Sequence, residues 1–224
     1  MESFGLGSED ADAELYLSLG LKGKRNGGIP RVLSIISSLL ERSVQKNEKI
    51  SETGRKKDVI TVFHGLRAPA LSIREYLDRI FKYSSCSPSC FVIAHIYIDR
   101  FLKSANIRLN SLNVHRILIT SVMVAAKFID DKYFNNAYYA RVGGVSTSEM
   151  NRLELKFLFS LDFRLQVTVD EFRRHCFVLE KEAKGGGYHQ IERPIQICRV
   201  KEGWQNNVED ANCKVNIQQL TCGS

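Results

Sequence analysis

The 224-residue sequence lacks the features of membrane, secreted and fibrous proteins. Its longest mainly apolar stretch, residues 117–126, is far shorter than the roughly 20 residues that a membrane-spanning helix needs. The first residues, MESFGLGSEDADAE, have neither the basic start nor the apolar core of a secretory signal. We therefore expect the six cysteines to be reduced thiols in a cytosolic or nuclear protein, and we exclude a disulfide scaffold, a collagen-like chain and a membrane span.

The motifs of common enzymes are also missing. The chain has no Walker loop, no GxGxxG after a predicted strand and no GxSxG. Cys86, Cys90 and His95 do not have the spacing of a zinc knuckle, and packing is their favoured role. His175 and Cys176 are adjacent on a predicted helix and do not face each other as a catalytic pair would. We expect no catalytic residue, no cofactor and no metal ligand, and therefore no enzyme.

The net charge is +7, and the basic surplus is spread along the chain. Residues 1–20 contain five acidic and no basic side chains, whereas residues 21–60 contain ten basic and four acidic ones. The main apolar region, residues 61–182, has seventeen basic and twelve acidic side chains, scattered over all of its predicted helices. A DNA-binding protein gathers arginine and lysine on one face, so this distribution does not favour a nucleic-acid partner.

Hydrophobic spacing predicts an all-α protein. Apolar residues recur with a helical period in residues 30–44 and in five later segments, which begin near residues 73, 88, 113, 147 and 169. The segments that begin near 88 and 113 are apolar almost all round and are expected to be buried on several sides. No strand–turn–strand signal interrupts the series. The pattern predicts a five-helix bundle preceded by one further helix.

Three of the five helices share one start signal. The pairs Ser72 and Glu75, Ser146 and Glu149, and Thr168 and Glu171 each place a hydroxyl three positions before a glutamate. In a capping box the hydroxyl accepts a hydrogen bond from the backbone N–H of the glutamate, and the glutamate accepts one from the N–H of the capping residue. We expect all three helices to begin at these boxes.

Composition divides the chain into four parts. Residues 1–28 are acidic and then basic and are expected to be disordered, and residues 29–61 hold the first helix and a polar linker. Residues 62–182 form the helical domain, in which residues 132–144 are expected to be an irregular connection ending at two glycines. Residues 183–224 are expected to be a flexible tail.

Several segments are more specific than helical spacing. YIDRFL at 97–102, VAAKF at 124–128, and LE at 153–154 followed by Leu158, Leu161 and Phe163 resemble the cyclin box in order and spacing. VFHG at 62–65, YLDRIFKY at 76–83, NVHR at 113–116 and NAYYARVGG at 136–144 resemble plant P-type (U-type) cyclins, relatives of the yeast phosphate-signalling cyclin. The resemblance covers residues 62–182 and implies a five-helix cyclin fold with an additional N-terminal helix and flexible tails.

The resemblance implies a subunit that binds and activates a cyclin-dependent kinase, the plant A-type kinase being the expected partner. It implies a role in cell division or in nutrient or hormone signalling, in the nucleus and cytoplasm, with no membrane contact. In the family, a lysine late in the third helix and a glutamate early in the fourth hold backbone groups near the regulatory helix of the kinase. By motif these are Lys127 and Glu154. The apolar groove that receives the kinase helix would be formed by Val124, Phe128, Leu158 and Leu165.

Two alternatives remain open. Lys127 and Glu154 could form only a surface salt bridge with each other. The fold could also belong to a transcription or nucleic-acid-binding adaptor that has no kinase partner.

Two further points concern individual residues. Other cyclins pair an arginine of the first helix with the aspartate that corresponds to Asp99, but the matching position here is Ala70. Either Arg74 takes over from one turn further on, or Asp99 is held otherwise. Separately, LSLGL at residues 17–21 matches the LxLxL pattern with which some plant repressors bind corepressors, and a plain leucine patch is the favoured interpretation.

Overall fold

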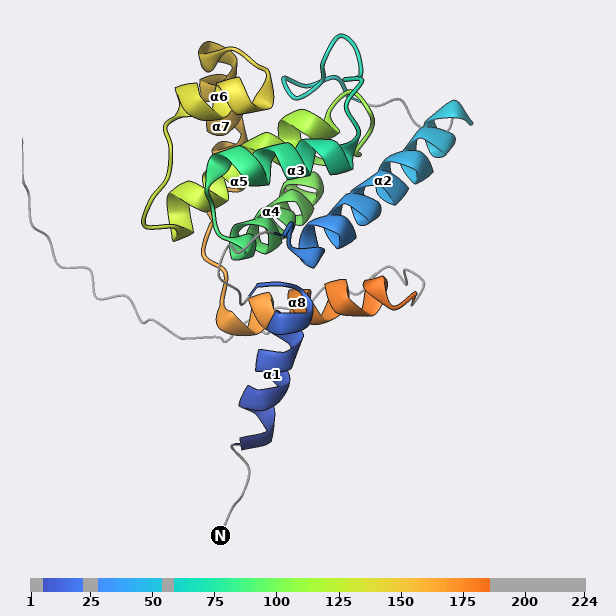
Figure 1. Cartoon of the computed structure of the whole chain (residues 1–224). Helices are drawn as coiled ribbons and strands as arrows, with labels where there is room; N and C mark the ends of the chain where they lie inside the picture. Colours follow the sequence, from blue (N-terminus) through green and yellow to red (C-terminus); the bar gives the residue numbers. More distant parts are fainter. Residues whose placement is uncertain (1–5, 22–27, 54–58, 186–224) are drawn as a thin grey trace, which may run out of the picture. The chain divides into compact units, whose positions relative to one another are not determined.

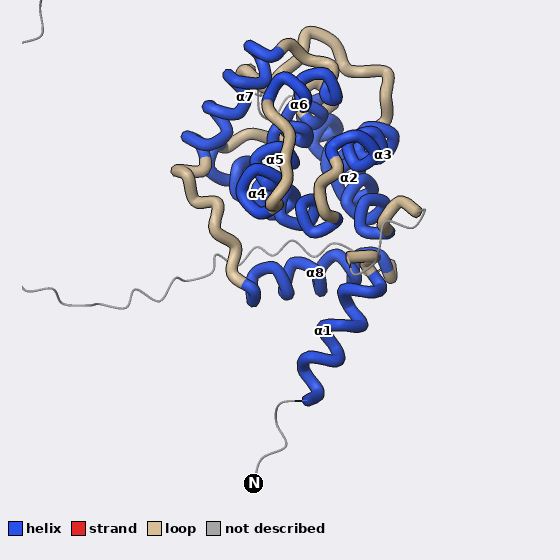
Figure 2. The backbone as a smooth tube through the Cα atoms, turned by 60° about the vertical axis from the view of Figure 1, so that its left-hand side comes forward, coloured by secondary structure: helices blue, strands red, loops and turns tan. Residues whose placement is uncertain are grey.

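The computed structural model describes residues 6–21, 28–53 and 59–185, and in these ranges every regular element is a helix (Figure 2). None of these helices has the combination of length and hydropathy needed to cross a membrane. The all-α prediction is confirmed. Beyond residue 185 the predicted tail lies outside the described residues. The helices are α1 (Leu6–Ser18), α2 (Arg31–Glu52), α3 (Ile73–Ser84), α4 (Pro88–Ala105), α5 (Val114–Ile129), α6 (Asn136–Gly143), α7 (Thr147–Ser160) and α8 (Val169–Ala183).

Helices α4 and α5 form the centre of the bundle (Figure 1). They pack most extensively on each other, while α2, α7 and α8 also contact α4, and α3, α6 and α7 also contact α5. Every residue of 114–126 except Arg116 is buried. The nearly all-round apolar sequence of these two helices is thus explained by neighbours on several sides.

The three predicted helix starts are confirmed, but only one carries a complete capping box. The Ser72 hydroxyl accepts a hydrogen bond from the Glu75 N–H at 3.2 Å, and the Glu75 carboxylate accepts one from the Ser72 N–H at 3.0 Å. At α7 and α8 only the first half forms, with Ser146 and Thr168 as the accepting side chains.

The glutamates of the two incomplete boxes bind arginines instead. Glu149 forms an ion pair with Arg116 of α5 at 2.6 Å, and Glu171 forms one with Arg100 of α4 at 2.7 Å. A charge-assisted bond to a guanidinium is stronger than a bond to a neutral backbone N–H. The two glutamates therefore link the first turns of α7 and α8 to the central helices α5 and α4 through ion pairs.

The connection expected to be irregular at residues 132–144 contains a helix, so that prediction was wrong for α6. The Asn135 side chain caps α6 by accepting from the Tyr138 N–H at 3.0 Å, and Gly144 ends it with a φ of 71°. Gly143 allows α6 to lie against α5, because a Cβ at this position would be 2.9 Å from the Ile119 side chain. Eight residues are too few for hydrophobic spacing to reveal such a helix.

The expectation of disorder over residues 1–28 was wrong for the described residues 6–21. Residues 6–18 form α1, which packs on α8, and Leu19 directly after it is fully buried. The Leu19 carbonyl accepts a hydrogen bond from the Val32 N–H at 3.0 Å, and Asp12 pairs with Arg173 of α8 at 2.7 Å. One of the acidic side chains whose abundance suggested disorder, Asp12, thus forms an ion pair with a basic side chain of the domain.

Replacing Leu19 with alanine should lower the free energy of unfolding by at least about 2 kcal/mol, because it removes a fully buried side chain. Leu17→Ala is the matched control, since Leu17 is 60% exposed and its loss should cost about 0.5 kcal/mol or less. Urea denaturation of both variants measures the difference. Equal and small effects would show that α1 is not held on the domain in solution. The burial of Leu19 also keeps the LxLxL pattern from being offered to a partner unless this segment detaches.

Candidate functional site

The two charged residues expected to anchor a partner lie side by side. Lys127 is in the last turn of α5, Glu154 is in α7, and their side chains form an ion pair at 2.7 Å. Asn136, the first residue of α6, joins them: it accepts a hydrogen bond from the Lys127 ammonium and donates one to Glu154 at 2.6 Å. The second side-chain N–H of Asn136 is directed at Asn151, whose oxygen is 2.8 Å from Nδ2. Three helices therefore meet in one polar cluster, which we call the Lys127 cluster (Lys127, Asn136 and Glu154).

The local sequence explains why the helices meet at this point. Asp130, just after α5, accepts hydrogen bonds from the Ser87 N–H and hydroxyl at 2.9 Å each, which fixes the end of α5 to the start of α4. The Asn135 cap then starts α6 beside Lys127. Asn136 was not among the residues expected at the site, although it begins the segment NAYYARVGG that carries part of the family resemblance and directly follows the capping Asn135.

The Lys127 cluster can still bind further groups. Lysine has three N–H donors, and Lys127 uses one for Asn136 and one for Glu154. Its third N–H has no partner in the described part of the chain, and each carboxylate oxygen of Glu154 has a second lone pair. The side chains of Lys127 and Glu154 are 27% and 19% exposed. The cluster can therefore donate to a carbonyl and accept from an N–H of another main chain.

The four expected groove residues differ in exposure. Val124 is buried in the core, and Leu158 and Leu165 are half-buried against it. Phe128, directly after Lys127, is 52% exposed. Of the four residues, Phe128 is therefore accessible to a partner, Leu158 and Leu165 are partly accessible, and Val124 is not.

Three apolar residues that the sequence prediction missed are also exposed. Leu155 and Phe159 lie one helical turn apart on α7, and Phe163 follows the helix with its ring centroid 5.2 Å from that of Phe159. Each exposes more than half of its surface. The helical period of α7 does contain this signal, because 155 and 159 fall on the face opposite the buried Leu153 and Phe157.

The backbone is strained where Phe163 is presented. Asp162 and Phe163 both have a φ of 53°, a left-handed conformation that a bulky residue rarely adopts. The turn is held by the Leu165 carbonyl, which accepts from the Tyr97 hydroxyl at 2.6 Å, and by Arg100, which donates to the carbonyls of Arg164 and Gln166. Strain of this kind persists where surrounding bonds fix it, and it is frequent at binding sites.

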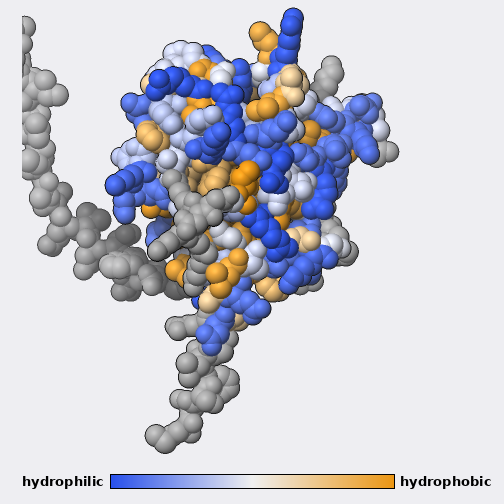
Figure 3. All heavy atoms as spheres, viewed as in Figure 1, coloured by the Kyte–Doolittle hydropathy of each residue, from blue (hydrophilic) through white to orange (hydrophobic). Residues whose placement is uncertain are grey.

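Most of the surface visible in Figure 3 is hydrophilic, unlike the exposed apolar residues described above. On the face shown in Figure 3, hydrophilic residues predominate and hydrophobic residues appear in small separate groups among them. Single exposed apolar side chains are normal on a soluble surface. Phe128 and Leu155 directly follow Lys127 and Glu154 in the sequence, and Phe159 and Phe163 lie one and two turns' length further along the chain from Leu155. We therefore take Phe128, Leu155, Phe159 and Phe163 together with the Lys127 cluster as the candidate binding surface.

Comparison with known proteins gives consistent matches. The family model described as "Cyclin" matches residues 30–165. The chain is 50% identical to Cyclin-P3-1 of Oryza sativa subsp. japonica, over 99% of this chain and 96% of the relative. It is 54% identical to Cyclin-U3-1 of Arabidopsis thaliana over 95% and 97%, and 54% identical to Cyclin-U4-1 of the same plant over 68% and 76%.

Proposed function

This chain belongs to the cyclin family, and from that premise we propose that it binds a cyclin-dependent kinase and helps to activate it. Cyclins are regulatory subunits rather than enzymes. The mechanism would be differential binding, in which the chain binds the active position of the regulatory helix of the kinase more tightly than the inactive one. The kinase population then shifts towards the active state without any chemical step on the cyclin.

The observation that carries the proposal is the candidate binding surface. The Lys127 cluster offers one donor and several lone pairs that can hold main-chain groups of a partner. Phe128 and Leu155, which directly follow Lys127 and Glu154 in the sequence, and Phe159 expose apolar area that a docking helix would cover. Charged anchors next to an apolar surface suit an amphipathic helix, which presents both kinds of group.

The basic side chains favour this function over a nucleic-acid adaptor. Several arginines of the described residues are in ion pairs with acidic residues of the same domain, and these arginines come from several helices: Arg31, Arg42, Arg74, Arg100, Arg116 and Arg173. Charges neutralised in this way are not available to phosphates. A DNA-binding face would need them free and on one side.

We further propose that the partner is the plant A-type kinase and that the complex acts in the nucleus and cytoplasm. The process served would be cell division or nutrient or hormone signalling. Support comes from the plant relatives, which share about half of their residues with this chain. Affinity purification of the tagged full-length chain from plant tissue, followed by mass spectrometry, tests the partner, and a fluorescent fusion tests the location.

Replacing Lys127 or Glu154 with alanine should weaken kinase binding by roughly ten- to a hundredfold. Each loses a charge-assisted hydrogen bond that becomes desolvated in the complex, and such a bond is worth about 1.5–3 kcal/mol. In the free chain the ion pair remains partly hydrated, so the free energy of unfolding should change by only about 1 kcal/mol. The double variant should resemble the single ones, because the two side chains act through one cluster.

The matched control is the ion pair between Arg74 and Asp78 on α3, which has a comparable length of 3.0 Å. Arg74→Ala and Asp78→Ala should leave kinase affinity unchanged. Isothermal titration with the recombinant kinase and thermal unfolding are measured on every variant. Wild-type affinity in all three Lys127 and Glu154 variants would exclude these residues as anchors, and a large loss of stability would identify them as structural charges.

A further inference from the structure

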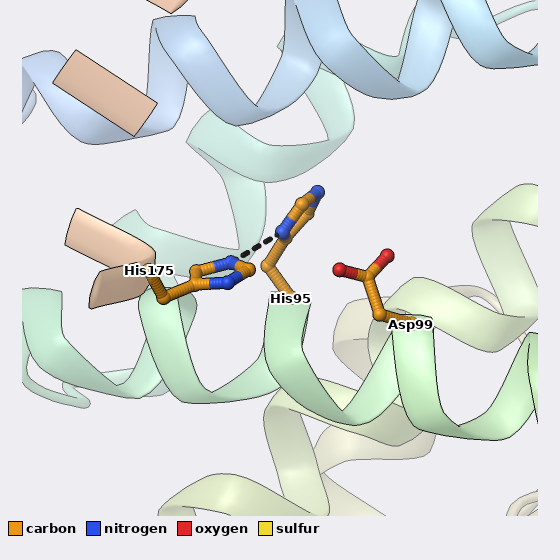
Figure 4. A group of neighbouring side chains, drawn as sticks. All are labelled: His95, Asp99 and His175. Atoms are coloured by element: carbon orange, nitrogen blue, oxygen red, sulfur yellow. Dashed lines mark hydrogen bonds between the residues drawn. The ribbon is translucent and has the colours of Figure 1, made fainter. Parts of the chain in front are cut away.

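Two histidines far apart in the sequence face each other between α4 and α8. Nδ1 of His95 is 2.8 Å from Nε2 of His175, and the ring centroids are 5.0 Å apart (Figure 4). Asp99 lies one turn after His95 on α4, and its carboxylate is on the other side of the His95 ring from His175. One ligand atom from each residue lies within 4.8 Å of the other two. All three residues are partly buried.

The structure excludes the first of the two alternatives left open by Ala70, in which Arg74 binds Asp99. Arg74 does not replace the missing arginine, because its guanidinium binds Asp78 of its own helix. Asp99 has no hydrogen bond or ion pair to any residue in the described part of the chain, and one of its carboxylate oxygens lies within 4.8 Å of a nitrogen of each imidazole. A carboxylate without a cationic partner that lies close to two imidazole nitrogens is typical of a metal ligand set.

We propose that His95, Asp99 and His175 bind a divalent transition-metal ion, Zn²⁺ in the first place. Zinc takes imidazole nitrogen and carboxylate oxygen at about 2.0–2.2 Å, and two nitrogens bound tetrahedrally are therefore about 3.3 Å apart. The nitrogens of the two rings need to separate by only about half an ångström to reach that spacing. The carboxylate moves closer by a rotamer change, and water supplies the fourth ligand.

The surroundings of His175 affect how tightly it binds a metal. Burial, together with the neighbouring His95 and Lys103, lowers the pKa of His175 to about 3. The ring is therefore neutral at pH 7 and keeps a lone pair on one nitrogen. Lys103 works in the opposite direction, because its positive charge repels a metal ion, but its side chain is exposed and can turn towards water.

A metal ion at this place would join α8 to the centre of the domain. His95 and Asp99 belong to α4, whereas His175 belongs to α8, the helix on which α1 packs. Binding to the folded chain alone stabilises it in proportion to the logarithm of the metal concentration. The ion would therefore strengthen the attachment of both outer helices without touching the candidate binding surface.

Titration of the full-length chain with ZnCl₂, without any kinase, tests the proposal. We expect one ion bound per chain and a rise in Tm of about 5–10 °C at a hundredfold excess over Kd. Co²⁺ should bind with the weak visible bands of nitrogen and oxygen ligands and without the intense near-ultraviolet band of thiolates. That spectrum separates this site from binding by the cysteines.

Variants assign the ligands. His95→Ala and His175→Ala should each weaken Zn²⁺ binding by roughly a hundredfold, and Asp99→Asn, which keeps the shape of the side chain, by about tenfold. Lys103→Gln should tighten binding. The proposal would be overturned if Asp99→Asn and either histidine variant bound Zn²⁺ with unaltered affinity. It would also be overturned by a cobalt spectrum with thiolate bands, or if the titration released no heat of binding and caused no shift in Tm. In the last case the two rings share only a hydrogen bond.

Discussion

Replacing Phe128 with aspartate should weaken kinase binding by at least about a hundredfold while leaving the free chain folded. The Phe128 side chain is 52% exposed and lies next to Lys127, so a helix bound at the candidate binding surface would cover it. An aspartate would then be buried against apolar groups without a partner, at a cost of at least about 3 kcal/mol. In the free chain the carboxylate would stay in water, so Tm should change by no more than about 2 °C.

Phe177→Asp is the matched control for this experiment. Phe177 is 63% exposed, carries the same side chain and lies on α8, away from α5 and α7 in the sequence. Biolayer interferometry with the immobilised kinase should give wild-type affinity for Phe177→Asp and a large loss for Phe128→Asp. Equal losses would indicate a general effect of the added charge, and equal wild-type affinities would mean that the kinase binds elsewhere.

Local signals in the sequence predicted the helices well because they act over three or four residues. The hydroxyl of Ser146 caps α7 as expected, since the cap depends only on the neighbouring N–H groups. The ion-pair partner of the Glu149 carboxylate was not predictable, because that partner, Arg116, is distant in the chain. The same limit applies to α1, whose stability comes from Leu19 and from Arg173 of α8 rather than from its own acidic sequence.

The candidate site was predicted in part. The family resemblance pointed to Lys127 and Glu154, and the structure shows that they are in contact, which is the salt bridge considered as an alternative. Contact in the free chain does not conflict with a role in binding, because the third Lys127 N–H remains to be used. Asn136 and the facing pair of histidines were missed, since side chains from different helices meet only after folding.

Replacing Phe157 with alanine should have the largest effect on stability, with a loss of about 3–5 kcal/mol in the free energy of unfolding. Phe157 of α7 is fully buried, and its ring is stacked on that of Phe101 of α4 with the centroids 4.9 Å apart. Phe63, which precedes α3, meets both rings in an edge-to-face arrangement, with its centroid 4.8 Å from that of Phe101 and 6.3 Å from that of Phe157. The cavity left by alanine would be lined by the two remaining rings, which cannot both move to fill it.

Phe159→Ala separates the two faces of α7, because Phe159 is only two residues away but 63% exposed. It should cost about 0.5 kcal/mol of stability and weaken kinase binding by roughly tenfold or more, since it removes apolar area from the candidate binding surface. Phe157→Ala should weaken binding only to the extent that the chain unfolds, and binding should recover at lower temperature or with a stabilising osmolyte. Chemical denaturation and kinase titration of both variants test this division. If Phe159→Ala loses stability and keeps affinity, α7 is turned differently in solution, and the candidate binding surface on this helix is wrong.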